Sequence, residues 1–320
     1  MAQNVRDLVR QYLPHFPSRH CGKIYSDTTE FMNINYGDVI YLNGLHYMVL
    51  RDESERRFGM EDPKFWVKRC TVMETGERKI LKLVFHENFP IKIGDVEILC
   101  HRSPIKESKV LDVVRGDMRF MQGETYSDEK DNPVRVIELI RGKSLDLIIN
   151  NIDVDHETYF RDYFSEILEK FIGSCEAIKF LHSHGLKHGD IRRDHIWIES
   201  KTNKYRWIDF DYAYDFQANP FALDVFGLGG ILIFITGKGD CTIGYLRERG
   251  FKDEDLSGLT HDDFSIIFGH RLVNLRKIYP YIPEALNDVL LHFSMGSDVF
   301  YDTVDEMLDD LRPCLGLLGS

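Results

Sequence analysis

The chain has 320 residues, of which 43% are hydrophobic and 29% are charged, and this length is enough for one large two-lobed domain or two smaller ones. Its net charge of -12 argues against general binding to nucleic acid or to an anionic membrane surface. The scattered cysteines form no Cys-x-x-Cys pair, which favours reduced thiols over a disulfide framework or a zinc site. We find neither a membrane-spanning stretch nor the apolar region of a signal peptide, and we expect a cytoplasmic protein.

The first part of the chain is predicted to be mainly β. Residues 1–35 are expected to form an N-terminal extension with a short amphipathic helix over Val5–Leu13. Short strands are predicted after it, over Val39–Leu42, His46–Arg51, Phe65–Met73 and Arg78–Phe85. The turn Glu74–Glu77 suits a hairpin between the last two strands.

The remainder is predicted to be mainly helical. A helix over Ser103–Arg115 has Pro104 near its start and Gly116 after its end, as helix termini prefer. Val134–Ile140 has the pattern of a buried strand. The other predicted helices are Tyr159–His182, a run beginning at Leu223, Tyr245–Arg249, Phe264–Ile278, Pro283–Phe293 and Thr303–Arg312.

Two acidic residues flank a short predicted hairpin in the middle of the chain. Its strands are Ile196–Ile198 and Trp207–Ile208, and its turn is Glu199–Lys204. Asp190 precedes the first strand and Asp209 follows the second, so we expect both to lie at one end of the hairpin. Phosphoryl transfer needs such a pair, one carboxylate to orient a hydroxyl nucleophile and another to hold a metal ion.

The residues around these acids resemble the motifs of the protein-kinase-like superfamily, H-x-D-x-x-x-x-N and D-F-G. The first motif is matched by His188-Gly189-Asp190, with His195 at the asparagine position, and the second by Asp209-Phe210-Asp211. The resemblance implies an α+β fold with two lobes. The small antiparallel β lobe with one main helix would cover residues 36–140, and the larger, mainly helical lobe residues 141–320.

The resemblance also implies roles for the residues of these motifs. Asp190 would orient the acceptor hydroxyl, and Arg192 stands where serine/threonine kinases have the lysine that steadies the transferred phosphoryl group. The metal ligands would be Asp209, Asp211 and His195. An imidazole ligand beside carboxylates suggests Mg²⁺ or Mn²⁺, with tolerance of manganese.

ATP is the cofactor that this family would use. Lys82, in the predicted strand Arg78–Phe85, would contact the α- and β-phosphates, and Glu107 is our choice for its ion-pair partner, with Glu97 as the alternative. The backbone carbonyl of Glu138 and the amide of Ile140 would meet the adenine edge in the hinge.

The glycine-rich loop of kinases has no close counterpart here. The corresponding stretch, Asp52–Pro63, contains one glycine, Gly59, where backbone amides could approach the phosphates. Arg56 or Arg57 would add positive charge, and the acids around them would oppose it.

The implied function is that of an ATP-dependent phosphotransferase acting on a hydroxyl of a protein or of a small hydroxylated molecule. The segment between Asp209 and Asp224 is short and lacks A-P-E, and Gly189 replaces the arginine that binds an activating phosphate. We therefore expect no switching by phosphorylation of this segment, and an acceptor other than an ordinary protein serine. Asp224 is expected to hydrogen-bond the catalytic-loop backbone.

The alternative is a pseudokinase-type scaffold that binds a nucleotide or a partner without catalysis, as the missing glycine loop and the replaced asparagine suggest.

Overall fold

The computed structural model describes residues 4–57, 60–93 and 96–318, and the chain in it forms two compact units. The first unit comprises Met1–Glu87 and Arg102–Ile140, and the second comprises Asn88–His101 and Arg141–Ser320. The residues predicted as an N-terminal extension therefore belong to the first unit. The inserted segment Asn88–His101 groups with the second.

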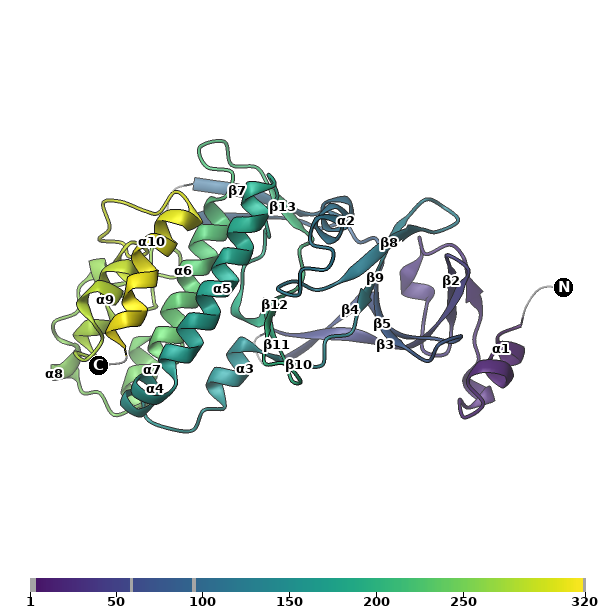
Figure 1. The fold of residues 1–320 in the computed structure, drawn as a ribbon, viewed down its shortest axis with the longest axis horizontal. Helices are drawn as coiled ribbons and strands as arrows, with labels where there is room; N and C mark the ends of the chain where they lie inside the picture. Colours follow the sequence, from purple (N-terminus) through teal and green to yellow (C-terminus); the bar gives the residue numbers. More distant parts are fainter. Residues whose placement is uncertain (1–3, 58–59, 94–95, 319–320) are drawn as a thin grey trace. The chain divides into compact units, whose positions relative to one another are not determined.

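The first unit contains a seven-stranded sheet in the order β1-β2-β3-β4-β5-β9-β8 (Figure 1). Only β1 and β2 are parallel among the paired strands described in this sheet. The strands are β1 (Ile24–Tyr25), β2 (Val39–Leu42), β3 (Leu45–Arg57), β4 (Met60–Val72), β5 (Arg78–Lys82), β8 (Gly123–Ser127) and β9 (Pro133–Glu138).

Strands β3 and β4 form one long hairpin and extend well beyond the predicted strands His46–Arg51 and Phe65–Met73. Their pairing continues to Arg57 opposite Met60. Cross-strand ion pairs support it, since Asp52, Glu53 and Glu55 pair with Lys68, Arg69 and Lys64 at 2.7, 2.6 and 3.1 Å. The negative charges of Asp52, Glu53 and Glu55 on β3 are thus balanced by positively charged side chains on β4.

Among its described residues, the first unit has two α-helices, α1 (Val5–Tyr12) and α2 (Pro104–Val113). The side chain of Ser103 caps α2 by accepting the N–H of Lys106 at 3.2 Å, and Gly116 follows with φ +81°. The buried face of α1, which consists of Val5, Leu8 and Val9, packs against the sheet in one apolar cluster with Val39, Met48 and Met73. Short 3₁₀ turns lie at Ser18–His20 and Phe31–Asn33.

The second unit is mainly helical, with α5 packed against both α6 and α10 (Figure 1). Its α-helices are α3 (Leu145–Asn150), α4 (His156–Asp162), α5 (Phe164–Ser183), α6 (Ala222–Gly237), α7 (Ile243–Glu248), α8 (Asp253–Leu256), α9 (Glu284–Leu291) and α10 (Val304–Cys314). Its 3₁₀ turns are Arg193–His195, His261–Asp263, Leu275–Lys277 and Leu315–Leu317.

Two of the predicted helices differ from the structure. The helix predicted over Tyr159–His182 is divided into α4 and α5 at Tyr163, whose φ of -123° leaves the helical range. The prediction of a helix over Phe264–Ile278 is wrong, because that segment makes isolated β-bridges such as Phe264 with Leu272 and is helical only at Leu275–Lys277.

The second unit also holds two three-stranded sheets, of order β10-β11-β12 and β13-β7-β6. The first joins β10 (Gly142–Ser144) to the predicted hairpin, which is β11 (Ile196–Glu199) and β12 (Tyr205–Trp207). The second joins β13 (Tyr212–Tyr214) to the hairpin of the inserted segment, β6 (Asn88–Ile93) and β7 (Val96–Arg102).

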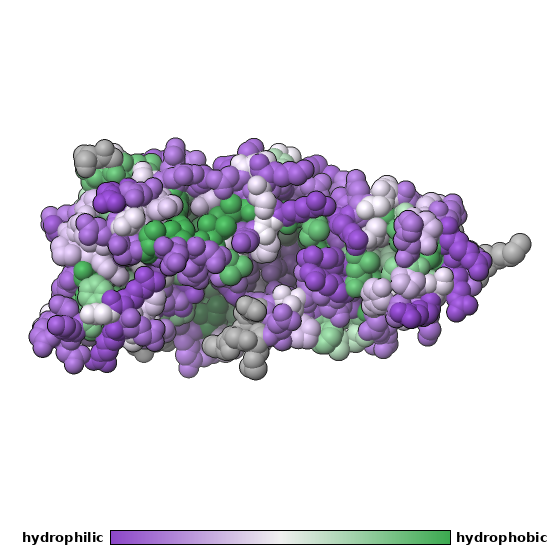
Figure 2. All heavy atoms as spheres, turned by 90° about the horizontal axis from the view of Figure 1, so that it is seen from below, coloured by the Kyte–Doolittle hydropathy of each residue, from purple (hydrophilic) through white to green (hydrophobic). Residues whose placement is uncertain are grey.

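The surface view in Figure 2 shows a face that is largely hydrophilic, with hydrophobic residues in separate patches. Within the described part of the chain, no helix has the length and apolar character needed to cross a membrane.

Candidate active site

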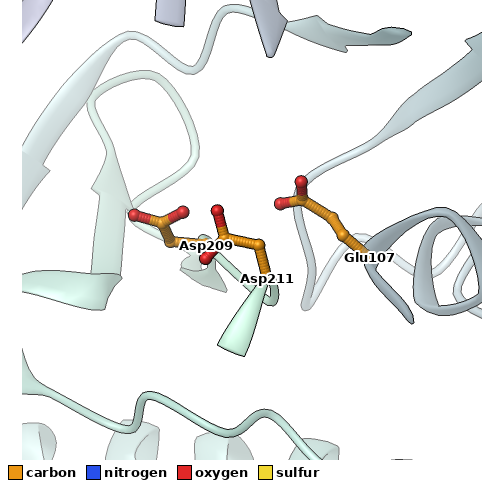
Figure 3. Close-up of side chains that lie close together, drawn as sticks. All are labelled: Glu107, Asp209 and Asp211. Atoms are coloured by element: carbon orange, nitrogen blue, oxygen red, sulfur yellow. The ribbon is translucent and has the colours of Figure 1, made fainter. Parts of the chain in front are cut away.

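Lys82 and Glu107 form a buried ion pair in the first unit. Lys82 ends β5, and its Nζ lies 2.7 Å from Oε1 of Glu107 in the first turn of α2. Glu107 projects from this helix in Figure 3. Glu97, the alternative partner, lies on β7 in the second unit with its carboxylate 3.6 Å from Lys92. The structure therefore gives Lys82 the partner that we preferred.

Arg135 is a third member of this buried cluster that the sequence did not lead us to. Its Nε lies 3.1 Å from Oε2 of Glu107, and its other guanidinium nitrogens donate to the carbonyl oxygens of Pro133 and Leu83 at 2.7 and 3.1 Å. Neither Glu107 nor Arg135 is exposed. One carboxylate thus serves two cations, Lys82 and Arg135, and holds both in position.

The loop around Asp190, which was predicted to be catalytic, is anchored by Asp224 in the first turn of α6. The carboxylate accepts the backbone N–H groups of His188 at 2.7 Å and Gly189 at 2.8 Å, and the Nε2–H of His182 at 3.0 Å. Burial raises the pKa of Asp224, but the hydrogen bonds and positive charge around it hold the pKa below its ordinary value of 3.8. Asp224 is therefore a charged anchor for the loop backbone.

Packing of the His188 ring also holds this loop in place. It is fully buried and meets the rings of Trp207 and Phe210 edge-on, with centroid distances of 4.9 and 5.0 Å. The next residue, Gly189, has φ +86°, a conformation that residues with a Cβ rarely adopt. This geometry accounts for glycine where the resemblance would place an arginine.

Asp190, His195 and Asp209 lie together at the end of the β11–β12 hairpin. Nδ1 of His195 donates to the backbone carbonyl oxygen of Asp190 at 2.8 Å and lies 3.5 Å from the Asp190 carboxylate. Because a carbonyl oxygen only accepts, Nδ1 carries a proton, and Nε2 is the ring nitrogen that would ligate a metal ion. Nε2 lies 3.7 Å from Oδ2 of Asp209.

The two acids of the D-F-D stretch differ in backbone and burial. Asp209 has φ +68°, the left-handed conformation that is uncommon outside glycine and that occurs at functional sites. Asp211 is completely buried, as is Phe210 between the two acids. Figure 3 shows both carboxylates projecting from the segment that follows β12.

Burial and several neighbouring charged groups shift the pKa of Asp190. Burial raises its pKa above the ordinary value of 3.8, His195 and Arg192 lower it, and Asp209 and Asp211 raise it, with a net increase. A carboxylate with a raised pKa is a stronger proton acceptor, which suits a general base.

Arg192 is held by a neighbour in the same loop. Its Nη2 lies 2.6 Å and its Nε 3.0 Å from the carboxylate of Asp194. Burial raises the pKa of Asp194, but the charges of His195 and Arg192 bring it below its ordinary value. This bidentate pair orients the guanidinium beside Asp190.

Comparisons with known proteins bear on the fold. No family model matches the chain. It is 26% identical over 178 residues to the serine/threonine-protein kinase TDA1 of Saccharomyces cerevisiae, a match that covers 51% of this chain and 29% of the length of TDA1. Among solved structures it is similar to the PknI kinase domain of Mycobacterium tuberculosis, with a TM-score of 0.50 and 11% identity over 86% of this chain and 96% of that domain.

The chain has the fold of the protein-kinase-like superfamily. Its first unit corresponds to the β lobe of that α+β fold with α2 as the main helix, and its second unit to the helical lobe. The fold class predicted from the sequence is confirmed.

Three further positions were predicted to bind the nucleotide, namely Glu138, Ile140 and Gly59. Glu138 ends β9, and its N–H donates to the carbonyl oxygen of Gln122 at 2.9 Å. Ile140 is the last residue of the first unit. Gly59 lies outside the described residues. The roles of all three stay predictions.

The inserted hairpin β6–β7 is a feature that we did not predict as a sheet. Its β7 pairs with β13 directly after the D-F-D stretch, and Ile98, Cys100 and Tyr214 form a buried cluster there. The ring of Phe89 also meets that of Tyr212 at 5.0 Å. The segment that follows Asp211 is thereby held by strand pairing and apolar contacts.

Proposed function

We propose that this chain is an ATP-dependent phosphotransferase that moves the γ-phosphoryl group of ATP to a hydroxyl group. The observation that carries the proposal is the grouping of Asp190, His195 and Asp209 at one end of the hairpin. Asp190 would orient the acceptor hydroxyl and take its proton, for which the raised pKa of this carboxylate suits it. Arg192 would steady the transferred phosphoryl group.

The proposed metal ligands are Asp209, Asp211 and His195. The donors fit a divalent ion, because Nε2 of His195 lies 3.7 Å from a carboxylate oxygen of Asp209. Mixed nitrogen and oxygen donors favour Mn²⁺ more than an all-oxygen set does, while Mg²⁺ remains acceptable. When bound, the ion would neutralise charge on the phosphates.

On the nucleotide side, Lys82 would contact the α- and β-phosphates, positioned by Glu107. Their ion pair of 2.7 Å supports this role, and Arg135 reinforces Glu107. The backbone of Glu138 and Ile140 would meet the adenine ring, as the resemblance implies.

The decisive experiment measures transfer from labelled ATP with Mn²⁺ or Mg²⁺ for the wild type and for Asp190→Asn. Loss of a general base lowers the rate by about 10²–10⁴-fold. A matched control is Asp253→Asn, since the side chain of Asp253 is 81% exposed. Equal transfer by the wild type and Asp190→Asn would contradict the proposal.

A thermal-shift measurement separates this function from that of a scaffold. A ligand that binds only the native state raises its stability by an amount set by concentration and Kd, about 2.7 kcal/mol at a hundredfold excess over Kd. We expect ATP with Mn²⁺ to raise the Tm of the wild type and to raise that of Asp209→Asn less. No change in the wild type would leave the partner-binding scaffold as the better account.

A further inference from the structure

A pocket of about 430 Å³ opens beside the catalytic loop in the second unit. Asp190, Arg192, Arg193 and Asp194 of this loop line it. Its volume is within the range of about 300–1,000 Å³ that small-molecule sites occupy. The proposed catalytic carboxylate thus faces a space large enough for a small acceptor.

Helix α6 forms one wall of the pocket through Phe226, Gly227, Gly230 and Ile231. A Cβ at Gly227 would lie 2.6 Å from Cβ of Ile191, so this glycine allows the helix to pack against the catalytic loop. A Cβ at Gly230 would meet no atom within 4 Å. Gly230 therefore adds open space to the pocket instead of serving close packing.

The other walls come from segments outside the kinase-like motifs. Ile91 of β6 brings in the inserted hairpin, and Ile267, Phe268 and Arg271 come from the non-helical segment after His261–Asp263. The guanidinium of Arg271 lies 4.0 Å from the centroid of the Phe268 ring. Apolar side chains predominate in the lining, namely those of Ile91, Ile191, Leu223, Phe226, Ile231, Ile267 and Phe268.

The charged groups of the pocket do not favour a cationic ligand. The carboxylate of Asp240 holds Arg193 at 2.6 and 2.7 Å and Arg271 at 3.3 Å. Asp194 holds Arg192 in the same way at 2.6 Å. The guanidinium groups are thus fixed by neighbouring acids, and the lining carries no excess of carboxylates that would attract a cation.

The chain beside the pocket is too short for the platform on which a kinase binds an extended peptide. Residues 215–221 alone connect β13 to α6. Peptide recognition relies on a sheet edge or a groove several residues long. A compact pocket next to a short connection suits a compact molecule instead.

We propose that this pocket binds the phosphate acceptor and that the acceptor is a small alcohol with an apolar body and no positive charge. This inference rests on the phosphotransferase function proposed above. The apolar body would lie between α6 and Phe268, with the hydroxyl group directed to Asp190.

The proposed transfer step forms one P–O bond and breaks another. The acceptor oxygen forms a bond to the γ-phosphorus while the bond from that phosphorus to the β–γ bridging oxygen breaks, and ADP leaves with the electron pair. The hydroxyl proton passes to the carboxylate of Asp190. The products are ADP and a phosphomonoester of the alcohol.

The test offers defined acceptors to the full chain with ATP and Mn²⁺ and detects phosphomonoesters by phosphorus NMR. The acceptors are phenylethanol and para-hydroxymethylbenzoate as neutral and anionic apolar alcohols, kanamycin as a cationic polyol, and a degenerate peptide mixture containing serine and threonine. We expect phosphorylation of an apolar alcohol and not of kanamycin or the peptides.

Gly230→Leu fills the pocket and is expected to lower kcat/KM for the apolar alcohol by about tenfold or more, since pocket contacts of one or two methylene groups have effects of that size. Gly173→Leu is the matched control, because Gly173 also lies inside a helix, α5, and its Cβ would meet no atom within 4 Å. As a second variant, Phe268→Ala removes a side chain that is 41% exposed, and it should raise KM more than it lowers kcat.

The outcomes separate this inference from the function on which it rests. Phosphorylation of the peptides or kanamycin alone, with a rate unchanged by Gly230→Leu, would overturn the small-alcohol pocket and leave the phosphotransferase intact. Failure of ATP with Mn²⁺ to raise the Tm of the wild type would overturn both. Equal loss of alcohol phosphorylation in Gly230→Leu and Gly173→Leu would also count against the pocket.

Discussion

The carboxylate of Asp224 accepts the backbone N–H of Gly189 at 2.8 Å, so the first turn of α6 fixes the residue that directly precedes Asp190. Gly189 has φ +86°, and the hydrogen bond stabilises this left-handed conformation. The geometry of the loop that contains Asp190 therefore depends on an ionised, buried acid outside the loop.

Stability should depend on the ionisation of Asp224. Its pKa in the folded chain is below the ordinary value of 3.8, so the unfolded chain binds the proton more readily than the folded chain. The contribution of Asp224 to stability is complete above 3.8 and is lost as the pH falls through that value towards the folded pKa. Asp224→Asn should cost about 2–5 kcal/mol at neutral pH, because it weakens buried hydrogen bonds to a charged group.

The measurement is the free energy of unfolding in urea for the wild type and Asp224→Asn at several pH values. The difference between the two should shrink as the pH is lowered below 3.8. A difference that stays constant through the acidic range would show that the charge of Asp224 does not support the loop.

The buried cluster of the first unit leads to a second prediction. Glu107→Gln removes the carboxylate that both Lys82 and Arg135 contact, and we expect a loss of about 3–5 kcal/mol in the free energy of unfolding. Lys82→Met should cost less, because Arg135 remains paired with Glu107 at 3.1 Å. Urea denaturation of each variant and of the wild type measures these losses in the free energy of unfolding.

Glu97→Gln is the control for this series, since the carboxylate of Glu97 is 59% exposed and its ion pair with Lys92 lies at the surface. We expect its effect to stay within about 0.5 kcal/mol. An equally large loss in Glu97→Gln and Glu107→Gln would mean that the buried cluster is not what makes Glu107 important.

Local signals in the sequence were enough for the elements with clear boundaries. Helix α2 could be predicted because Ser103 and Pro104 mark its start and Gly116 follows its end. The β11–β12 hairpin could be predicted because a polar turn separates two apolar runs, and Asp190 and Asp209 then follow from their positions beside it.

Elements that depend on distant partners could not be predicted from local patterns. The segment Phe264–Ile278 has apolar residues at helical spacing, but its backbone pairs with distant residues, as Ser265 does with Ser294. Strand β6 contains Pro90, which interrupts a strand pattern and is tolerated here because β6 lies at the edge of its sheet. Its neighbour β7 pairs with β13, more than a hundred residues later in the chain.

Arg135 was missed for another reason. It lies within the apolar run Val134–Ile140, which we interpreted as a simple buried strand. A charged residue inside such a run needs a buried partner of opposite charge, and that requirement was a signal for a buried acid that we did not use.

The metal preference should depend on His195. His195→Asn supplies an amide oxygen where Nε2 now lies 3.7 Å from the carboxylate of Asp209. Because Mg²⁺ favours oxygen ligands, activity with Mg²⁺ relative to Mn²⁺ should rise by about tenfold or more. Rates measured with each metal give this ratio.

His261→Asn is the matched control for the metal experiment, since the side chain of His261 is 80% exposed. This variant should keep the wild-type ratio of activity with Mg²⁺ to activity with Mn²⁺. An unchanged ratio in His195→Asn as well would exclude His195 as a metal ligand.

The inserted hairpin should hold the segment after the D-F-D stretch without phosphorylation. Ile98 is 3% exposed in the cluster with Cys100 and Tyr214, whereas its neighbour Leu99 on the opposite face of β7 is 63% exposed. Ile98→Asp places a charge in this cluster, and β13 should then lose much of its support. We expect amide hydrogen exchange at Tyr212–Tyr214 to become faster by about tenfold or more, because strand pairing protects these amides only while the sheet stays closed.

Leu99→Asp is the control on the same strand, and exchange at β13 should stay as in the wild type. Transfer from ATP should fall in Ile98→Asp and not in Leu99→Asp, because Asp209 and Asp211 directly precede β13. If both variants exchange at the wild-type rate, the hairpin does not hold this segment. The hydrogen bond that Nζ of Lys187 donates to the carbonyl oxygen of Tyr214 at 2.6 Å is another contact that supports it.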